Sequence, residues 1–223
     1  MYGRRRWLGM VAAAALAFGH ACVAAADEGV PLAPAPPLDA VLSRLAADPV
    51  TPREYTANVD LHVKLRVFPF IRLTLHGNSS YKRPGLYHFV FRGVPKAAEK
   101  FNDLNYDLGD PSKWPARYDI AFAPQSTPAL PVIRLTPKVR GMVKTLDVAV
   151  EMSKGHLMKA TWSRFDGGTI TLVQKFAPVG DREIVAQQTA TIDIPHMKAE
   201  LSANYEDFVV AGIPVVAGVP ADR

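Results

Sequence analysis

The sequence predicts a mainly β fold: an antiparallel curved sheet, or half-open β-barrel, of about ten strands with an N-terminal helix and a mid-chain helical lid. Two observations predict the sheet. Apolar and polar residues alternate in many short runs, and turn residues separate those runs. A third observation predicts the helical covers, because a short amphipathic segment precedes the first run and an irregular segment interrupts the series.

The longest alternation covers residues 55–67, where odd-numbered residues are apolar and even-numbered residues are polar. A run of this kind is typical of a strand with one buried and one wet face. Shorter runs with the same period follow at 71–75, 87–91, 118–122, 133–135, 146–152, 158–162, 170–172, 184–194 and 199–205. Because tight turns join most of them, the runs predict a meander of antiparallel strands.

Two segments outside this series predict the helices. Residues 38–46 place apolar side chains at helical spacing, which indicates a short amphipathic helix. Residues 94–117 break the alternation, and their stretch 95–104 is compatible with a helix. An insert of this length within a β series is usually a lid or a functional loop.

Length and charge narrow the classes of function. The chain has 223 residues, 48% of them hydrophobic, which is enough for one domain with a sizeable core. Its formal net charge is +5, but without the arginines at 4–6, which lie in a segment that we expect to be cleaved, 23 basic residues face 21 acidic ones. Such a nearly neutral chain lacks the basic character of nucleic-acid binding, so no nucleic acid is expected as a partner.

The first 26 residues are organised like a signal peptide. The arginines at 4–6 precede an apolar stretch at 7–18, and the alanines at 24–26 supply a cleavage site. The expected location is therefore the periplasm. Cys22, the one cysteine of the chain, would be removed with this peptide, which excludes disulfides and thiolate chemistry from the mature protein. In the alternative interpretation Cys22 is a lipid anchor, although the residues before it differ from a lipobox.

Composition divides the rest of the chain into three parts. Residues 27–37 are rich in Pro and Ala and predict an extended leader. The β domain covers residues 38–210. Residues 211–223, in which the alternation is lost, predict a C-terminal tail.

The inward rows of the sheet predict an apolar cavity. A barrel of about ten strands is too wide to be filled by one row of side chains, so its interior tends to hold a helix or a ligand. The rows here are aliphatic and aromatic, which favours an apolar ligand. The predicted ligand-binding residues are Val63, Leu65, Leu73, Leu75, Tyr87, Phe89, Phe91, Phe122, Leu146, Val148, Val150 and Trp162.

Catalytic and metal-binding motifs do not emerge from the sequence. The histidines after residue 26 form no His-x-x-x-His or Glu-x-x-His pair, and the serines lie in no Gly-x-Ser-x-Gly elbow. We therefore predict no catalytic residue, no metal and no cofactor, and expect that the protein is not an enzyme. One alternative is a metal site built across strands by His62, His76 and His88. Another is a calcium loop at residues 103–110, with aspartates at 103, 107 and 110.

Three segments in a particular order carry a resemblance to a known family. Residues 81–89 read Tyr-Lys-Arg-Pro-Gly-Leu-Tyr-His-Phe, residues 166–172 join an Asp-Gly-Gly turn to Thr-Ile-Thr-Leu, and residues 192–208 contain Ile-Asp-Ile-Pro and Asn-Tyr-Glu-Asp-Phe. Over most of residues 38–214 the chain thereby resembles the periplasmic lipoprotein-carrier superfamily, which includes LolA, LolB and the RseB-like sensors. The resemblance implies a half-open β-barrel, closed by helices over a hydrophobic cavity that binds acyl chains. The insert 94–117 does not match that pattern.

The predicted function is that of a periplasmic carrier that holds acyl chains of lipids or lipoproteins in an apolar cavity. Its expected partners are a lipid, acyl-chain or lipoprotein cargo and a membrane protein that donates or accepts it, and the chain is expected to be a monomer.

Two alternative functions belong to other classes. One is an RseB-like sensor or protein-interaction module, marked by a filled barrel with an exposed apolar patch. The other is a hydrolase with a lipid pocket.

Overall fold

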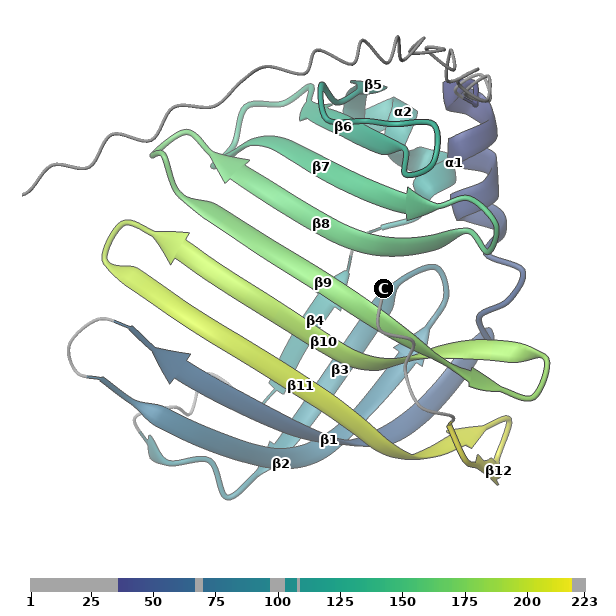
Figure 1. Ribbon diagram of the computed structural model, residues 1–223. Coiled ribbons are helices and arrows are strands. Elements are labelled where there is room, and N and C mark those ends of the chain that lie inside the picture. The colour runs from purple at the N-terminus through teal and green to yellow at the C-terminus, as the bar shows by residue number, and fades with distance from the viewer. Residues whose placement is uncertain (1–35, 67–69, 97–102, 108, 218–223) are drawn as a thin grey trace, which may run out of the picture. The chain divides into compact units, whose positions relative to one another are not determined.

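The protein consists of one long antiparallel sheet with short helices, as a computed structural model shows (Figure 1). The structure describes residues 36–66, 70–96, 103–107 and 109–217. The predicted signal peptide at 1–26, Cys22 and most of the leader lie outside the described residues. No helix in the described part of the chain is long and apolar enough to cross a membrane.

Twelve strands in the described part of the chain form a single sheet. In chain order the elements are α1 (Leu38–Ala47), β1 (Glu54–Leu65), β2 (Arg72–Lys82), β3 (Leu86–Arg92), β4 (Asp103–Asp107), the 3-10 helix η2 (Pro111–Lys113), α2 (Trp114–Arg117), β5 (Tyr118–Phe122), β6 (Val132–Pro137), β7 (Val143–Glu151), β8 (His156–Arg164), β9 (Thr169–Val179), β10 (Arg182–Ile194), β11 (Met197–Val210) and β12 (Ile213–Val215). The sheet order is β4-β3-β2-β1-β11-β10-β9-β8-β7-β6-β5, and β12 pairs with β11.

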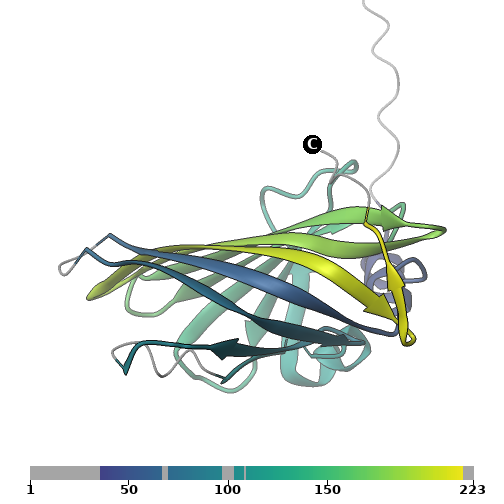
Figure 2. The ribbon, with the colours of Figure 1, turned by 90° about the horizontal axis from the view of Figure 1, so that it is seen from below.

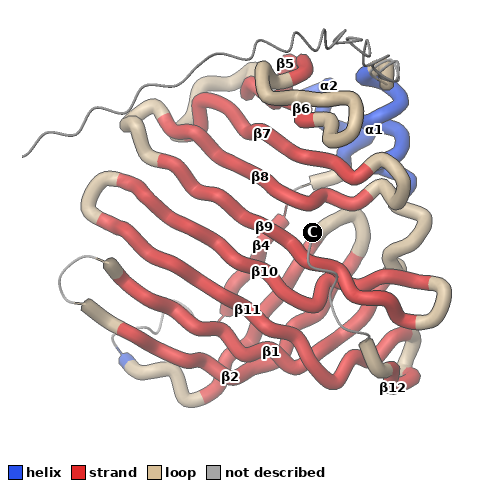
Figure 3. The backbone as a smooth tube through the Cα atoms, viewed as in Figure 1, coloured by secondary structure: helices blue, strands red, loops and turns tan. Residues whose placement is uncertain are grey.

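The predicted mainly β fold is confirmed, and the period-two pattern explains it. The odd-numbered residues of β1 from Tyr55 to Val63 are buried, while the even-numbered ones face solvent or are half-buried. Tight turns join successive strands from β6 to β11, so that the strands form an almost uninterrupted meander (Figure 3). The two ends of the order, β4 and β5, do not pair with each other among the described residues, so the sheet is open there.

The sheet is strongly curved, and the helices lie on its inner side. Seen from below, β2 to β4 turn back beneath the middle strands, and α1 lies on that same side (Figure 2). The helix begins after Pro37, buries Val41 and Leu45, and packs against η2. It matches the helix predicted at residues 38–46.

The insert 94–117 differs from the expected helical lid in one respect. Residues 103–107 form the strand β4, which pairs with β3 through Tyr87–Tyr106 and Phe89–Leu104. Its sequence Asp-Leu-Asn-Tyr-Asp alternates with period two, which is a strand pattern, and only its first two residues lie in the stretch 95–104 that is compatible with a helix. Among the described residues of the insert, η2 and α2 at residues 111–117 form short helices. Residues 97–102 lie outside the described part.

The predicted tail also contains structure. Residues 213–215 form β12, which pairs with the end of β11 through Val209–Pro214 and Val210–Ile213. Residues 218–223 of that tail lie outside the described residues.

Candidate functional site

The register of the sheet brings the predicted ligand-binding residues onto one face, called here the inner face. Directly paired residues share a face, and one transverse row runs through Leu73, Val63, Leu201, Ala190, Leu172, Ala160, Val148, Ile133 and Phe122. A second row runs through Leu65, Ala199, Ile192, Ile170, Trp162, Leu146 and Leu135. The inner face is therefore apolar across the middle of the sheet, from β2 to β6.

Two apolar clusters fill much of this face. The aromatic cluster contains Val63, Leu75, Tyr87, Phe89 and Phe91 as buried members, with Leu65 and Leu73 packed against it. The helix cluster contains Leu146, Val148 and Val150, packed with Val41 and Leu45 of α1 and with Trp114 of α2, and Trp162 lies at its margin. Eleven of the twelve predicted residues thus belong to or border a packed cluster, while Phe122 is 38% exposed.

A polar seam separates the two clusters. Gln174 of β9 and Gln188 of β10 are direct cross-strand partners, and both are buried. The Tyr205 hydroxyl donates a hydrogen bond to Gln188 Oε1 at 2.5 Å. The amide nitrogen of Gln188 is buried without a hydrogen-bond partner among the described residues, so it remains available as a donor.

The enclosed space on this face is small. A cavity of about 50 Å³ lies beside the seam, between α1, η2 and the turns that follow β2 and β7, with Leu45, Tyr81, Trp114, His156 and Gln174 among its lining residues. Ligand pockets usually measure about 300–1,000 Å³. This cavity therefore holds water-sized occupants, whereas a more open hollow of about 550 Å³ has Val63, Leu73 and Leu201 among its lining residues.

A half-open apolar surface remains on the inner face, at the ends of the strands away from α1. Six side chains from six strands are only partly buried there, and they are called the inner-face patch: Leu65, Leu73, Trp162, Ile170, Ile192 and Leu201. Leu65 and Ile192 lie close to the ends of their strands, and Leu73 and Ile170 lie close to the beginnings of theirs. The patch is therefore continuous with the packed clusters, and no helix of the described residues covers it.

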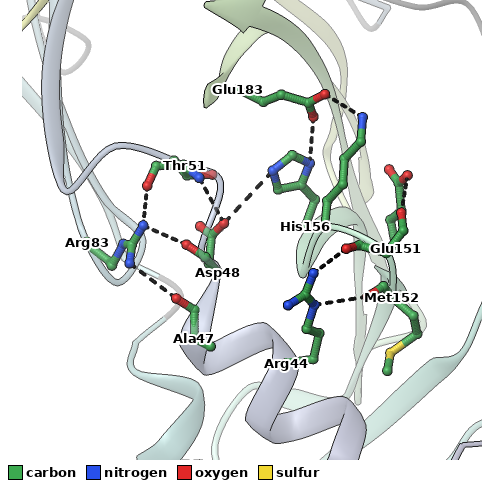
Figure 4. A network of polar contacts seen from close by, with 11 residues as sticks. Arg44, Ala47, Asp48, Thr51, Arg83, Glu151, Met152, His156 and Glu183 are labelled. Carbon is green, nitrogen blue, oxygen red and sulfur yellow. Dashed lines mark hydrogen bonds and ion pairs between the residues drawn. The ribbon is translucent and has the colours of Figure 1, made fainter. Parts of the chain in front are cut away.

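A polar cluster fastens the C-terminal end of α1 to the sheet (Figure 4). The Arg83 guanidinium, from the turn after β2, donates to the carbonyl oxygens of Ala47, Asp48 and Thr51, with 2.6 Å to that of Asp48. Arg44 of α1 donates to the carbonyl oxygens of Met152, at 3.0 Å, and Ser153 in the turn after β7. These bonds cross from the helix to two separate hairpins.

His156 lies at the centre of that cluster. Its ring is fully buried and stacks on Phe176, with 3.8 Å between ring centroids. Nδ1 is 3.3 Å from Glu183 Oε2 and Nε2 is 3.9 Å from Asp48 Oδ1, yet neither ring nitrogen has a partner in hydrogen-bond geometry among the described residues. Burial lowers the pKa of His156 from 6.5, although the nearby carboxylates oppose this shift. The imidazole is consequently held neutral near neutral pH.

The sequence did not single out His156, although a signal was present. His156 is in phase with Met158, Ala160 and Trp162, the inward row of β8. A histidine that falls at the inward-facing positions of a strand is expected to be buried. The histidines of the other strands, His62, His76 and His88, fall at outward-facing positions. The neighbouring Gly155 has a φ of +80°, and a Cβ there would lie 2.5 Å from the Arg44 carbonyl oxygen, so the close approach of α1 requires glycine.

The outer face holds the histidines considered for a metal site. His62 Nδ1 is 3.0 Å from Thr74 Oγ1, and His76 Nδ1 is 2.6 Å from Asp60 Oδ1. No group of three or more His, Cys, Asp or Glu side chains that could hold a metal occurs in the described ranges.

The calcium loop considered at residues 103–110 includes Asp110, which caps η2 by accepting a hydrogen bond from the Ser112 backbone N–H at 3.0 Å. The side chains of Asp103 and Asp107 lie outside the described part.

Comparison with solved structures identifies the fold. A DUF1329 family protein from Desulfovibrio piger superposes with a TM-score of 0.55 at 10% identity, over 78% of this chain and 93% of that chain. A LolA superfamily protein from Nitrosomonas europaea gives 0.52 at 11% identity, over 79% and 94%. A domain assigned to outer membrane lipoprotein sorting from Vibrio parahaemolyticus gives 0.54 at 9% identity, over 78% and 91%.

These likenesses confirm the LolA-like fold that the sequence predicted, and at such identities they concern the fold alone. No family model and no curated protein matches the chain by sequence.

Proposed function

We propose that this chain is a periplasmic carrier that holds acyl chains of a lipid or lipoprotein against the inner face of its sheet. The inner-face patch carries the proposal, because six strands contribute half-exposed apolar side chains to one continuous surface. Contiguous exposed apolar surface usually marks a binding site for an apolar partner. The signal peptide predicted at residues 1–26 and the LolA-like fold support the periplasmic location.

The energy of acyl-chain burial is large enough to open the closed form. A chain of about 14 methylenes gains about 10 kcal/mol when it leaves water. Moving α1 away exposes Val41 and Leu45 to water, and exposing each side chain costs about 1.5–3 kcal/mol of free energy. The gain exceeds this apolar loss, while the hydrogen bonds of Arg44 and Arg83 at the end of α1 and the entropy of association are further costs of displacing the helix. Release then requires an acceptor that binds the chain more tightly, such as a membrane protein or a second carrier.

Binding without catalysis is sufficient for this role. The mechanism uses apolar surface, a displaceable helix and the Gln188 amide as a donor for a polar group of the cargo. No cofactor is needed, and one chain supplies the whole inner face.

Native mass spectrometry of the protein purified under mild conditions tests the proposal. Co-purified lipid or lipopeptide, identified after extraction, is the expected result. Uptake of a fluorescent fatty acid by the apo protein in vesicle-free buffer is the second expected result. A clean apo mass together with no uptake would refute the carrier.

A second candidate is a protein-interaction module, and the small cavity favours it. Both apolar clusters are filled, and the enclosed space measures about 50 Å³. A half-exposed apolar patch on a filled sheet can equally bind an apolar segment of another protein. The negative result described above, combined with protection of the inner-face patch by a bound peptide, would establish this function in place of the first.

A further inference from the structure

The hairpin turns at one end of the sheet form a connected edge. In an antiparallel meander every second turn lies at the same end, and the turns after β1, β6, β8 and β10 do so here. Figure 1 shows the last two one above the other along the left edge. We call this edge the hairpin rim and define it as residues 64–66, 70–72, 138–144, 164–168 and 193–200.

Direct contacts join the turns of the rim. The Phe165 backbone N–H donates to the Met142 carbonyl oxygen at 3.2 Å, which links the turns after β6 and β8. The Arg66 N–H donates to the Lys198 carbonyl oxygen at 2.7 Å, which links the turns after β1 and β10. Gly168 lies against Ile194, so the two pairs of turns are also in contact. The rim is therefore one surface and not a set of separate loops.

Every turn of the rim presents an apolar side chain to solvent. Four of these side chains are more than half exposed, and the exposed fractions are 77% for Phe70, 84% for Val139, 65% for Met142, 52% for Phe165 and 38% for Met197. Turns usually carry small or polar residues, because they face water. Large apolar residues at four adjacent hairpin turns indicate a surface that contacts an apolar partner, such as another protein or a membrane.

The rim is also strongly basic. It contains eight lysines and arginines and three carboxylates. Each of these carboxylates, Asp166, Asp193 and Glu200, already forms an ion pair within the rim. Arg140 lies over the Phe165 ring, with 5.0 Å between the guanidinium carbon and the ring centroid, so cation and apolar side chain are adjacent. The positive excess of the rim contrasts with a mature chain that is nearly neutral as a whole.

We propose that the hairpin rim docks onto the surface of an anionic lipid bilayer. Apolar side chains flanked by lysine and arginine are the composition of interfacial membrane anchors, where the apolar groups enter the acyl boundary and the cations meet the headgroups. A protein partner would need a complementary acidic and apolar surface, whereas a bilayer supplies both features along the full length of the rim.

This inference rests on the proposed carrier function and adds the site of loading. The inner-face patch lies at the same ends of the strands as the rim, with Leu65 next to Arg66 and Trp162 close to Phe165 in the chain. A rim in contact with the bilayer would bring the half-open end of the inner face to the headgroup region. An acyl chain could then pass from the bilayer to the patch without crossing bulk water.

Vesicle flotation of the purified protein tests the docking. Vesicles of phosphatidylcholine with phosphatidylglycerol serve as the anionic surface, and pure phosphatidylcholine vesicles serve as the neutral one. We expect binding to the anionic vesicles that weakens as salt increases, because screened charges attract less. The double variant Met142→Gln/Phe165→Gln is expected to bind about tenfold more weakly, since two apolar anchors are lost.

A matched control keeps the test specific. Ile213 and Val216 are exposed by 66% and 92% but lie outside the rim, so Ile213→Gln/Val216→Gln should bind vesicles like the unaltered protein. Equal binding of both double variants, or no preference for anionic vesicles, would overturn the proposal. Uptake of a fluorescent fatty acid in vesicle-free buffer is measured separately. Normal fatty-acid uptake without vesicle binding would reject membrane docking by the rim and leave the carrier function intact. Absent uptake would reject the carrier function.

Discussion

The two ends of the inner face are built from the same alternating strands but differ in what covers them. Near α1, side chains such as Ile133 and Val148 are completely buried beneath Val41, Leu45 and Trp114. Toward the hairpin rim, strands β1, β2 and β8 to β11 present the half-exposed residues of the inner-face patch. Alternation therefore decides which face is apolar, while the short helices decide which part of that face is closed.

The closed end should carry most of the stability. Trp114 is 2% exposed in the helix cluster, and Trp114→Ala is expected to lower the free energy of unfolding by about 3–5 kcal/mol, since it removes packing and leaves a cavity. Phe165→Ala, in the rim, should change it by about 0.5 kcal/mol or less. Urea denaturation of both variants measures the difference. Similar losses in the two variants would contradict the division into a closed and an open end.

The open end, which holds the inner-face patch, should provide most of the affinity for acyl chains. The variant Leu73→Ser/Leu201→Ser shortens two patch residues that are not fully buried, and we expect it to bind a fluorescent fatty acid about tenfold more weakly. Its unfolding free energy should fall far less than that of Trp114→Ala. Fluorescence titration gives the affinity, and the exposed pair Ile213→Gln/Val216→Gln is the control. An unchanged affinity would show that cargo does not use the patch.

Acid should weaken the fastening of α1. Because burial lowers the pKa of His156 in the folded protein, the unfolded chain binds more protons as the pH falls below 6.5. Stability from this group is present above that pH and is lost toward lower pH, by about 1.4 kcal/mol for each pH unit that separates the pKa values of the folded and unfolded states. Protonated His156 would still face the carboxylates of Asp48, Glu183 and Glu151, as well as the Lys154 amine, so the loss should be moderate.

The variant His156→Gln isolates that contribution. Urea denaturation between about pH 8 and about pH 5 should show a smaller acid-dependent loss in this variant than in the unaltered protein. The matched control is Gln125→Ala, which removes an exposed hydrogen bond to Asp147 without changing a histidine, and it should keep the original profile. If His156→Gln kept that profile as well, the acid sensitivity would have another source.

Much of the fold could be predicted from the sequence, because it depends on local alternation. Residues 55–65 alternate without interruption, and the structure forms β1 there with the expected face buried. Strand β4 was missed because its five residues lie in a segment with helix-forming neighbours, and pairing with β3 decides its conformation. The short β12 has no alternation of its own and exists through its pairing with β11.

The site could be predicted only in part. Eleven of the twelve predicted ligand-binding residues lie in or beside the apolar clusters of the inner face, but which of them stay half-exposed depends on where α1 and α2 pack. Val148 and Leu73 look alike in the sequence, yet the first is fully buried and the second is not. The hairpin rim also requires the strand order, since its turns are far apart in the chain.

The smallest expected effect concerns the movement of α1. Arg44 joins the helix to the turn after β7 through two carbonyl oxygens, one of them at 3.0 Å. Arg44→Ala removes these charge-assisted bonds from a partly exposed site, so stability should fall by only about 1 kcal/mol. If α1 must move aside to admit cargo, the same variant should take up a fluorescent fatty acid faster, with little change in affinity for the patch. Stopped-flow fluorescence measures that rate, and Asn58→Ala is a control that removes an exposed hydrogen bond to Asp207 away from both α1 and the hairpin rim. A rate unchanged by Arg44→Ala would mean that acyl chains reach the inner face through its open end while α1 stays in place.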